Sequence, residues 1–392
     1  MSLRRRLAFS LLAIMTVIIA LLLYGAFPLR ETTPVNLVEH PLTLRSNILI
    51  QADRDFTQIG AGMGCGCVRS GSGNQEDPYV IAGWSLNASA ADGISISGTR
   101  AYFLIRGVDV QGESTHVGIF LKQVENGRIE DSLIAGNSVG VYAFDSSNLV
   151  FVRNRVIGNR YGIWLEASNN NLLILNRLET NEEVAIFVRG SDSVVRNNNV
   201  TRNGFGGINI DGTSGFGDGN VIEGNVVKDN LSYGITMWHV RNSTVTGNNV
   251  TKNGTGIALT DESHNNTVKG NNVTQNDGNG IALLEGSSEN TVKGNTAKGN
   301  GNGADTFDLY DAGSNNIWND NIYGTKNPDT LASLCTQEDE MRSDDNPPTN
   351  TPRVEPQQRN AHPTEDQCGS MNLPTSVAER INTQTTPPTL GG

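Results

Sequence analysis

Short apolar stretches that alternate like β-strands recur along most of the chain. Each begins with Gly or another small residue, as in GISIS, GVYAF, GIWLE and GIALT. Their first positions are 93, 118, 140, 162, 185, 207, 234, 256, 280 and 306, so the spacing runs from 22 to 27 residues. Alternation with a period of two is typical of strands with one buried face. The regular spacing indicates a structural repeat.

Polar residues, mostly Asn, recur at two fixed positions in each period and would form two columns if the periods stack. One holds Asp131, Asn154, Asn176, Asn198, Asn225, Asn248, Asn271, Asn295 and Asp320. The other precedes the glycine motifs and holds Asn137, Asn159, Asn181, Asn203, Asn230, Asn253, Asn276 and Asn300. Asn tolerates the left-handed backbone of turns, and stacked Asn side chains can form an amide ladder at the strand spacing of about 4.8 Å.

Short strands joined by polar turns predict that each period is one coil of a parallel β-helix. We expect an all-β solenoid of about ten coils over residues 47–330. Right-handed winding is predicted because parallel crossovers overwhelmingly take that hand.

The two ends of the chain follow a different pattern. Residues 1–6 contain three arginines, and residues 7–27 form an uncharged apolar run. A helix of about 20 apolar residues spans a bilayer, and basic flanks stay cytoplasmic. We therefore expect a transmembrane signal anchor at residues 7–27, a linker at 28–46, and a single-pass protein whose bulk is extracytoplasmic. Residues 331–392, rich in Pro, Thr and Gln, are predicted to be a disordered tail.

Composition and charge narrow the class of protein. Hydrophobic residues make up 36% of the chain and there are 44 glycines, which suits a thin core built from many short strands. The formal net charge is -12. Because the phosphates of nucleic acids need a basic face, this acidity argues against nucleic acid as a partner.

The periodic block resembles the parallel β-helix repeat family that includes the NosD-type periplasmic proteins, and most of all its archaeal membrane-anchored surface members. The resemblance is carried by the GIALT…NNTVKGNNVTQN repeats and by the entry DPYVIAGWSL…DGISI…YFLIRGVDV, from Asp77 to Val110. The repeat specifies the fold strongly and chemistry weakly, since the same coil supports enzymes, adhesins and structural proteins. The NosD resemblance implies copper delivery to a reductase outside the membrane.

The outward positions of the glycine motifs are predicted to form stripes along the rod. Four consecutive coils place Phe120, Tyr142, Trp164 and Phe187 in one column, and Trp238 lies in the column two residues further on. A contiguous apolar patch on an outer surface usually marks an interface. Flat rings beside charged groups suit a sugar polymer, so these five residues are the candidate ligand-binding residues. The alternative is a stacked ladder that only stabilises the rod or is covered by a loop or linker.

Glu166 and Asp211 are candidate catalytic carboxylates, with Arg189 between them. Two coils separate them, or about 9.6 Å by strand spacing, at the upper edge of the roughly 6.5–9.5 Å of an inverting pair. A salt-bridged ladder through Arg189 is the simpler interpretation. We therefore predict non-enzymatic binding of a surface polysaccharide or an envelope protein, with a polysaccharide lyase or glycoside hydrolase as an alternative.

The sulfur-bearing residues raise the question of metal. Met63, Cys65 and Cys67 alternate in the loop GMGCGC, and soft sulfur ligands suit Cu(I). Cys335 and Cys368 bring the cysteines to four, which allow three disulfide pairings in an oxidising compartment. Three alternatives stand: a Cys335–Cys368 disulfide with a bond at the first pair, a copper site at Met63, Cys65 and Cys67, or unpaired thiols.

Overall fold

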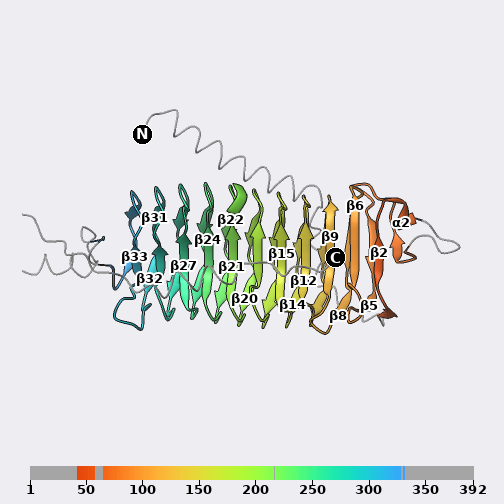
Figure 1. Cartoon of the computed structure of the whole chain (residues 1–392), viewed down its shortest axis with the longest axis horizontal. Helices are drawn as coiled ribbons and strands as arrows, with labels where there is room; N and C mark the ends of the chain where they lie inside the picture. Colours follow the sequence, from red (N-terminus) through yellow and green to blue (C-terminus); the bar gives the residue numbers. More distant parts are fainter. Residues whose placement is uncertain (1–41, 58–64, 216, 328–329, 332–392) are drawn as a thin grey trace, which may run out of the picture. The chain divides into compact units, whose positions relative to one another are not determined.

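The structure is a computed structural model that describes residues 42–57, 65–215, 217–327 and 330–331. These residues all belong to one compact unit, Met1–Asp344. The chain winds through three long sheets, and each coil contributes one short strand to each sheet (Figure 1). Ten complete coils follow one another, from β4–β5–β6 to β31–β32–β33. The predicted parallel β-helix of about ten coils is confirmed.

We name the sheets I, II and III. Sheet I contains β1 (Thr43–Arg45), β5 (Trp84–Asn87), β8 (Asp109–Gln111), β11 (Leu133–Ala135), β14 (Arg155–Ile157), β17 (Arg177–Glu179), β20 (Asn199–Thr201), β23 (Val226–Lys228), β26 (Asn249–Thr251), β29 (Asn272–Thr274), β32 (Thr296–Lys298) and β35 (Ile322–Tyr323). Strand β1 lies inside the segment predicted to be a linker, so the β-helix begins slightly earlier than residue 47.

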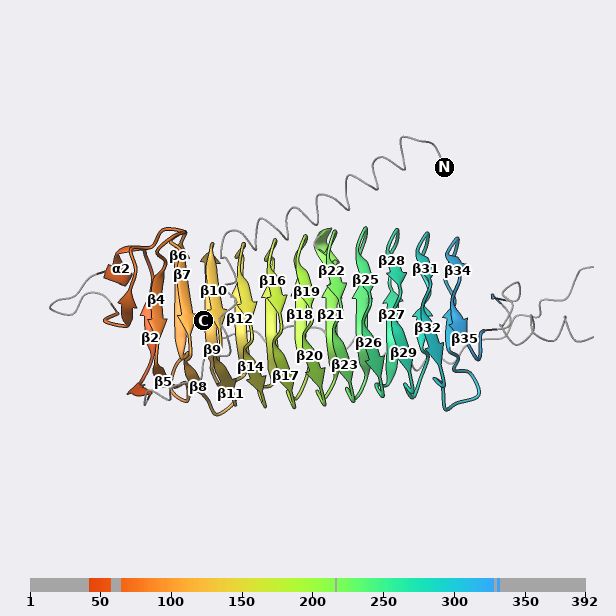
Figure 2. The same ribbon diagram turned by 180° about the vertical axis from the view of Figure 1, so that it is seen from behind.

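Sheet II contains β3 (Val68–Ser70), β4 (Tyr79–Ala82), β7 (Phe103–Arg106), β10 (Gly127–Glu130), β13 (Val150–Val152), β16 (Leu172–Ile174), β19 (Val194–Arg196), β22 (Val221–Glu223), β25 (Thr244–Thr246), β28 (Thr267–Lys269), β31 (Thr291–Lys293) and β34 (Ile317–Asn319). Its strands lie side by side when the rod is seen from behind (Figure 2). Strands β3 and β4 pair antiparallel, unlike the coils that follow.

Sheet III contains β2 (Ile48–Ile50), β6 (Ile94–Thr99), β9 (Val117–Val124), β12 (Val139–Phe144), β15 (Tyr161–Glu166), β18 (Ile186–Arg189), β21 (Gly206–Asp211), β24 (Tyr233–Trp238), β27 (Thr255–Thr260), β30 (Ile281–Leu283) and β33 (Leu309–Asp311). Within the described residues, the short helix α2 (Arg54–Thr57) and the 3-10 helix Thr213–Gly215 interrupt the strands.

The core is a set of stacked aliphatic columns. In sheet II, for example, Val245 pairs with Val268, which pairs with Val292, and all three are fully buried. Full burial of one such side chain stabilises the folded state by roughly 1.5–3 kcal/mol before conformational entropy is subtracted. A single well-placed aliphatic in each short strand is therefore enough when many coils repeat it.

The glycine that opens the motif is required by the close approach of adjacent coils. A Cβ atom at Gly140 would lie 2.7 Å from the carbonyl oxygen of Gly162 in the next coil and 2.6 Å from Cγ1 of Val156. At Gly118, the same atom would lie 2.6 Å from the carbonyl oxygen of Gly140. A side chain at these positions would require the next coil to shift, so glycine recurs there, although Ala185 occupies the equivalent place after Gly162.

The polar columns form buried ladders at the turns. The Nδ2 atom of Asn154 donates to Oδ1 of Asn176 at 3.0 Å, and the column continues to Asn295 and Asn321. The predicted end members are wrong: Asp131 and Asp320 occupy the preceding left-handed position, with φ of 52° and 55°. Ser132 and Asn321 take the ladder positions instead. The second predicted column, from Asn137 to Asn300, is confirmed throughout.

Several predictions fall outside the described residues. They are the transmembrane segment 7–27, most of the linker 28–46, nearly all of the tail 331–392, and residues Met63, Cys335 and Cys368. Among the residues that the structure describes, no helix is long and apolar enough to cross a bilayer.

Candidate functional site

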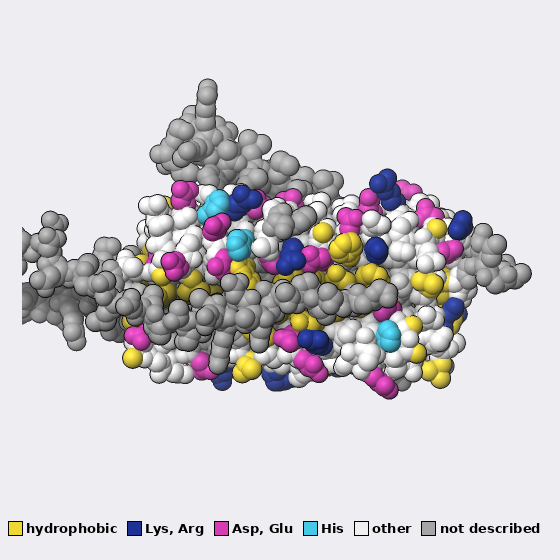
Figure 3. Space-filling model, viewed as in Figure 1, with side chains coloured by type: hydrophobic (Ala, Val, Ile, Leu, Met, Phe, Trp, Pro, Cys, Tyr) yellow, Lys and Arg dark blue, Asp and Glu magenta, His cyan; other side chains and the backbone are white. Residues whose placement is uncertain are grey.

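The candidate site lies on the outer surface of sheet III. In β12, Val141 and Ala143 point into the core and are buried, whereas Tyr142 is half-buried and Phe144 is exposed. This alternation recurs in the neighbouring strands and sends one aromatic ring per coil outward. Hydrophobic side chains are visible in stretches along the middle of this face, with acidic and basic side chains on both sides of them (Figure 3).

Four of the predicted ligand-binding residues stack in register. We call them the aromatic column: Phe120, Tyr142, Trp164 and Phe187. The ring centroids of Phe120 and Tyr142 lie 5.5 Å apart and stack, while those of Tyr142 and Trp164 lie 6.1 Å apart edge to face. The centroids of Trp164 and Phe187 are 4.7 Å apart. Such ring pairs add about 0.5–1.5 kcal/mol each beyond the area they bury.

Trp164 differs from the expectation of an exposed stripe. Its side chain is only 8% exposed, because Phe187 and Tyr161 pack against its ring, with the Tyr161 centroid at 4.9 Å. Its indole N–H also donates to Oε2 of Glu166 at 3.1 Å. Trp164 is therefore the anchor of the column, and the half-buried rings of Phe120, Tyr142 and Phe187 form its accessible part.

The two candidate catalytic carboxylates share one guanidinium. Nη1 of Arg189 lies 2.9 Å from Oε1 of Glu166, and its Nη2 lies 2.5 Å from Oδ2 of Asp211. The backbone N–H of Thr213 donates to the other oxygen of Asp211 at 2.8 Å. The salt-bridged ladder, which was the simpler interpretation of the sequence, is what the structure contains. A general acid and a general base both need free carboxyl oxygens, and these are largely engaged.

Burial and charge shift two pKa values at this site. Burial raises the pKa of the Tyr142 hydroxyl above its ordinary value, and the charge of Glu166 raises it further. For Arg189, burial alone would lower the pKa, but the hydrogen bond and charge of Asp211 and the charge of Glu166 raise it overall. Arg189 therefore stays charged, and the formal charges of this ion-paired group sum to about -1.

Trp238 lies beside this group. It pairs with Asp211 in β21 and with Thr260 in β27, and its ring stacks on that of His239 with centroids 6.4 Å apart. Its indole N–H has no hydrogen-bond partner within the described ranges, and neither have the Thr236 hydroxyl and Oδ1 of Asn209 on the same face. The aromatic pattern found Trp238, but nothing in the sequence indicated the unpaired atoms.

The sequence pattern also missed two features. Tyr161 joins the aromatic column from the start of β15 and could have been found as an outward position of the same strand. On sheet II, a second outward group of apolar residues is buried, namely Val150, Val152, Leu172, Ile174 and Val194. Its members lie in runs such as VFV and LLI, in which alternation is hidden because both faces are apolar.

Two family descriptions match the sequence. Residues 67–217 match "Right handed beta helix region", and residues 184–327 match "Periplasmic copper-binding protein (NosD)". Together these matches span residues 67–327, and with the parallel coils of the structure they support a right-handed β-helix of the NosD type. The expected hand is thereby confirmed for this NosD-type β-helix, and the family supports an extracytoplasmic location for its bulk. The resemblance to archaeal surface members stays a prediction. No curated protein matches the sequence.

Solved structures with similar coils include the A-module of mannuronan C-5 epimerase AlgE6 from Azotobacter vinelandii. It shares 16% identity at a TM-score of 0.49, over 64% of this chain and 87% of the module. The Dettilon tailspike protein shares 16% identity at a TM-score of 0.44, over 62% of this chain and 60% of the tailspike. These likenesses concern the fold alone.

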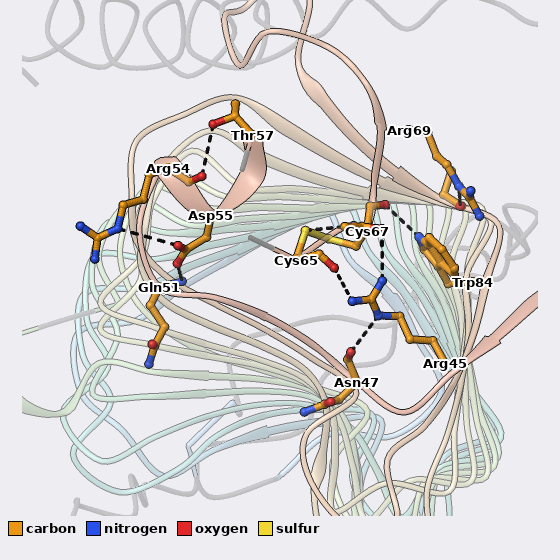
Figure 4. Close-up of a disulfide and its surroundings, with 12 residues drawn as sticks. Arg45, Asn47, Gln51, Arg54, Asp55, Thr57, Cys65, Cys67, Arg69 and Trp84 are labelled. Atoms are coloured by element: carbon orange, nitrogen blue, oxygen red, sulfur yellow. Dashed lines mark hydrogen bonds and ion pairs between the residues drawn. A yellow bond between two sulfur atoms is a disulfide. The ribbon is translucent and has the colours of Figure 1, made fainter. Parts of the chain in front are cut away.

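The first cysteine pair of this NosD-type β-helix is a disulfide. Cys65 and Cys67 are bonded to each other and buried in the N-terminal end of the core (Figure 4). The indole N–H of Trp84 donates to the carbonyl oxygen of Cys67 at 2.9 Å, and Arg45 donates to the carbonyl oxygen of Gly66 at 3.3 Å. Of the alternatives for this pair, the bond is the one that the structure contains.

This bond bears on the copper that the family description implies. Cu(I) binds cysteine as the thiolate, and the sulfur atoms of Cys65 and Cys67 are joined to each other instead. Across the described segments, no group of three or more His, Cys, Asp or Glu side chains comes together. With their sulfur atoms bonded to each other, Cys65 and Cys67 do not fit a copper site in this state. The site at Met63, Cys65 and Cys67 stays a prediction, since Met63 lies outside the described residues.

Proposed function

We propose that this protein binds a polysaccharide or an envelope protein without catalysis, through the outer face of sheet III. In this proposal residues 7–27 anchor the chain in the membrane and the rod projects outside the cytoplasm. The observation that carries the proposal is the in-register stack of Phe120, Tyr142, Trp164 and Phe187.

The physical basis is the combination of flat rings with fixed polar groups. Rings that project from adjacent coils repeat at about 4.8 Å along the rod, so they form a platform that can take the apolar faces of successive sugars in an extended polymer. The platform is rigid, because each strand is paired on both sides and Trp164 is locked to Glu166. A preorganised surface loses little entropy on binding.

The test removes accessible rings and measures retention on envelope polysaccharide. Tyr142→Ala and Phe187→Ala should each weaken retention about tenfold or more, since aromatic anchors dominate the energy of such surfaces. Leu231→Ala is the matched control, because Leu231 is 78% exposed in the turn between β23 and β24 and is not a member of the aromatic column. Urea unfolding of all three should stay cooperative. Retention equal to wild type in both ring variants contradicts the proposal.

A polysaccharide lyase or glycoside hydrolase is the enzymatic alternative, with Glu166 and Asp211 as its carboxylates. The ion pairs of both carboxylates with Arg189 argue against an enzyme, because carboxyl oxygens held by a guanidinium are poorly placed to transfer a proton. Incubation with acidic polysaccharides settles the choice. Product release that disappears in both Glu166→Gln and Asp211→Asn would favour the enzyme over the binding surface.

Copper handling is the other alternative, since the matched NosD description names a copper-binding protein. It is tested by titrating the chemically reduced protein with Cu(I) and counting the copper retained per chain. One equivalent that is lost in the Cys65→Ser/Cys67→Ser variant would support this function. No uptake by the reduced wild type would end it.

A further inference from the structure

Buried polar atoms without a partner gather on two adjacent coils of sheet III. They are Oδ1 of Asn209 in β21, the hydroxyl of Thr236 and the indole N–H of Trp238 in β24, and Nδ1 of His239 just after it. Among the described residues, the other unpaired atoms of this kind belong to Asn137, to Asn171 and to Arg196, which shares a coil with Asn209 but lies on sheet II. The concentration on β21 and β24 therefore needs a local explanation.

Leaving such atoms unpaired is unfavourable. Each buried polar group without a partner costs about 1–3 kcal/mol, and native proteins keep few of them. Thr236 is only 7% exposed, so bulk water does not satisfy its hydroxyl. The positions equivalent to Thr236 in the next two coils hold Ala258 and Ala282. The fold therefore does not require a polar side chain at this position. The cluster is therefore explained if a ligand supplies the missing partners.

The unpaired atoms continue the aromatic column along the rod. Phe187 pairs with Asn209, and Asn209 pairs with Thr236, so rings give way to hydrogen-bonding side chains in the same column. Adjacent members are about 4.8 Å apart, and Trp238 lies about 6.6 Å along the strand from Thr236. An extended chain lying on the rings would thus reach these atoms with its next units.

Their chemistry selects hydroxyl groups. The Asn209 oxygen accepts only, the Trp238 N–H donates only, and the Thr236 hydroxyl does both. A sugar hydroxyl donates and accepts, so it satisfies every one of them, whereas a carboxylate cannot serve the Asn209 oxygen. The nearby cation, Arg189, already binds Glu166 and Asp211, and this group carries a net negative charge. An anionic polymer is therefore disfavoured at this position.

We infer that Asn209, Thr236 and Trp238 form a hydroxyl-binding subsite for an uncharged polysaccharide that lies along the rod axis. The inference rests on the proposed function, because the same polymer stacks its rings on the aromatic column. It adds the class of ligand, the direction in which it lies, and the residues that hold its hydroxyls.

The test uses the full-length protein in mild detergent and affinity electrophoresis. The probes are three neutral polymers, galactomannan, xyloglucan and mixed-linkage β-glucan, and two acidic ones, alginate and polygalacturonate. We expect retardation by at least one neutral polymer and by neither acidic one. Thr236→Val keeps the shape of the side chain and removes the unpaired hydroxyl, and Trp238→Phe removes the indole N–H. Each should weaken retardation about tenfold, the equivalent of one lost hydrogen bond.

Stability separates a ligand-binding hydroxyl from a structural one. Because the Thr236 hydroxyl is unpaired in the free protein, Thr236→Val should leave the urea midpoint unchanged or raise it. Thr244→Val is the control, since Thr244 occupies an outward position on sheet II, and it should change neither retardation nor the midpoint by much. A lower midpoint for Thr236→Val would overturn the inference.

The remaining outcomes distinguish the inference from the proposed function. If Tyr142→Ala loses retardation while Thr236→Val and Trp238→Phe bind as wild type, the subsite is refuted and the proposed function stands. Retardation by the acidic polymers alone refutes the uncharged class. If the wild type binds none of the five polymers, polysaccharide binding on this face fails together with the inference.

Discussion

Nδ2 of Asn225 donates to Oδ1 of Asn248 in the next coil at 2.9 Å, and the backbone N–H of Asn225 donates to the same oxygen at 2.9 Å. Both side chains are buried. Asn248→Ala would leave the backbone N–H and one of the two Nδ2–H groups of Asn225 without an acceptor, at about 1–3 kcal/mol for each unpaired group. We expect the free energy of unfolding, measured by urea denaturation, to fall by about 3 kcal/mol.

The adjacent residue provides the control for this prediction. Asn249 is exposed on β26, and its side-chain oxygen accepts a hydrogen bond from Nδ2 of Asn272 at 3.0 Å on the outer surface. Asn249→Ala should change the free energy of unfolding by less than about 0.5 kcal/mol. Similar losses in the two variants would show that the buried ladder is not a major source of stability.

The ion pairs of Arg189 should stabilise the rod more than a surface pair does. Its side chain is 19% exposed and that of Asp211 is 6% exposed, so removing the guanidinium leaves buried carboxylates without a counter-charge. We expect Arg189→Met to lower the free energy of unfolding at pH 7 by roughly 1–3 kcal/mol. The double variant Arg189→Met/Asp211→Asn should recover part of this loss, as a double-mutant cycle would measure.

Arg196 offers the comparison on the surface. It pairs with Glu223 at 2.6 Å on sheet II, but both side chains are about a third exposed, at 32% and 40%. Arg196→Met should cost at most about 1 kcal/mol, because water and salt screen such pairs. If it destabilises the protein as much as Arg189→Met does, burial of the Arg189 group is not what makes it strong.

The fold was predictable because a solenoid turns sequence spacing directly into spatial position. Once Gly118 and Gly140 are aligned, the pairing of Phe120 with Tyr142 follows, since equivalent residues stack one coil apart. The prediction fails where the repeat degenerates. In the last coil the motif was placed from residue 306, but Leu309 is the residue that pairs with Ile281, after a longer turn.

Only those features of the site that repeat along the sequence could be predicted. The columns of rings and charges follow from alternation, but the burial of Trp164 depends on how Tyr161 and Phe187 pack around it. The unpaired state of Thr236 is likewise a property of its surroundings, which no repeat pattern encodes. A third ladder was not predicted, because its positions hold both Asn and Ser, as in Asn171, Ser193 and Asn220. Both residue types accept a hydrogen bond from the backbone N–H of the preceding coil with a side-chain oxygen.

Asp192 gives a prediction about pH. Burial raises its pKa above the ordinary value, and the charge of Asp218 raises it further. The folded state thus holds the proton more tightly than the unfolded state. The stability that the protonated group contributes is present below the ordinary pKa and is lost as pH rises through the folded value. At neutral pH the charged group is unfavourable, so Asp192→Asn should raise the melting temperature there and lose this advantage in acid.

Backbone conformation does not oppose the change at Asp192. Its φ is 55°, in the left-handed region that Asn tolerates well. Asp229 is the matched control, with φ of 56° and its carboxylate 3.5 Å from the ammonium of Lys228. Asp229→Asn should leave the melting temperature unchanged or lower it slightly. A gain in both variants at every pH would point to backbone preference as the cause.

The Cys65–Cys67 disulfide should stabilise only the N-terminal end of the rod. A disulfide acts chiefly by closing a loop in the unfolded chain, and a 15-residue loop is worth about 3 kcal/mol. The ring here spans a sequence separation of 2, so its contribution should be smaller, about 1.5 kcal/mol. Because each coil contacts only its neighbours, the loss on reduction should stay local.

Hydrogen exchange after reduction with dithiothreitol measures this locality. Exchange should rise in β1 and β5, next to the bond from Trp84 to Cys67, and stay unchanged in β26 and β27. The Cys65→Ala/Cys67→Ala variant should behave in the same way without reductant. Faster exchange throughout the rod would contradict this locality. It would mean that the N-terminal end caps the whole stack and that the disulfide stabilises coils far from it.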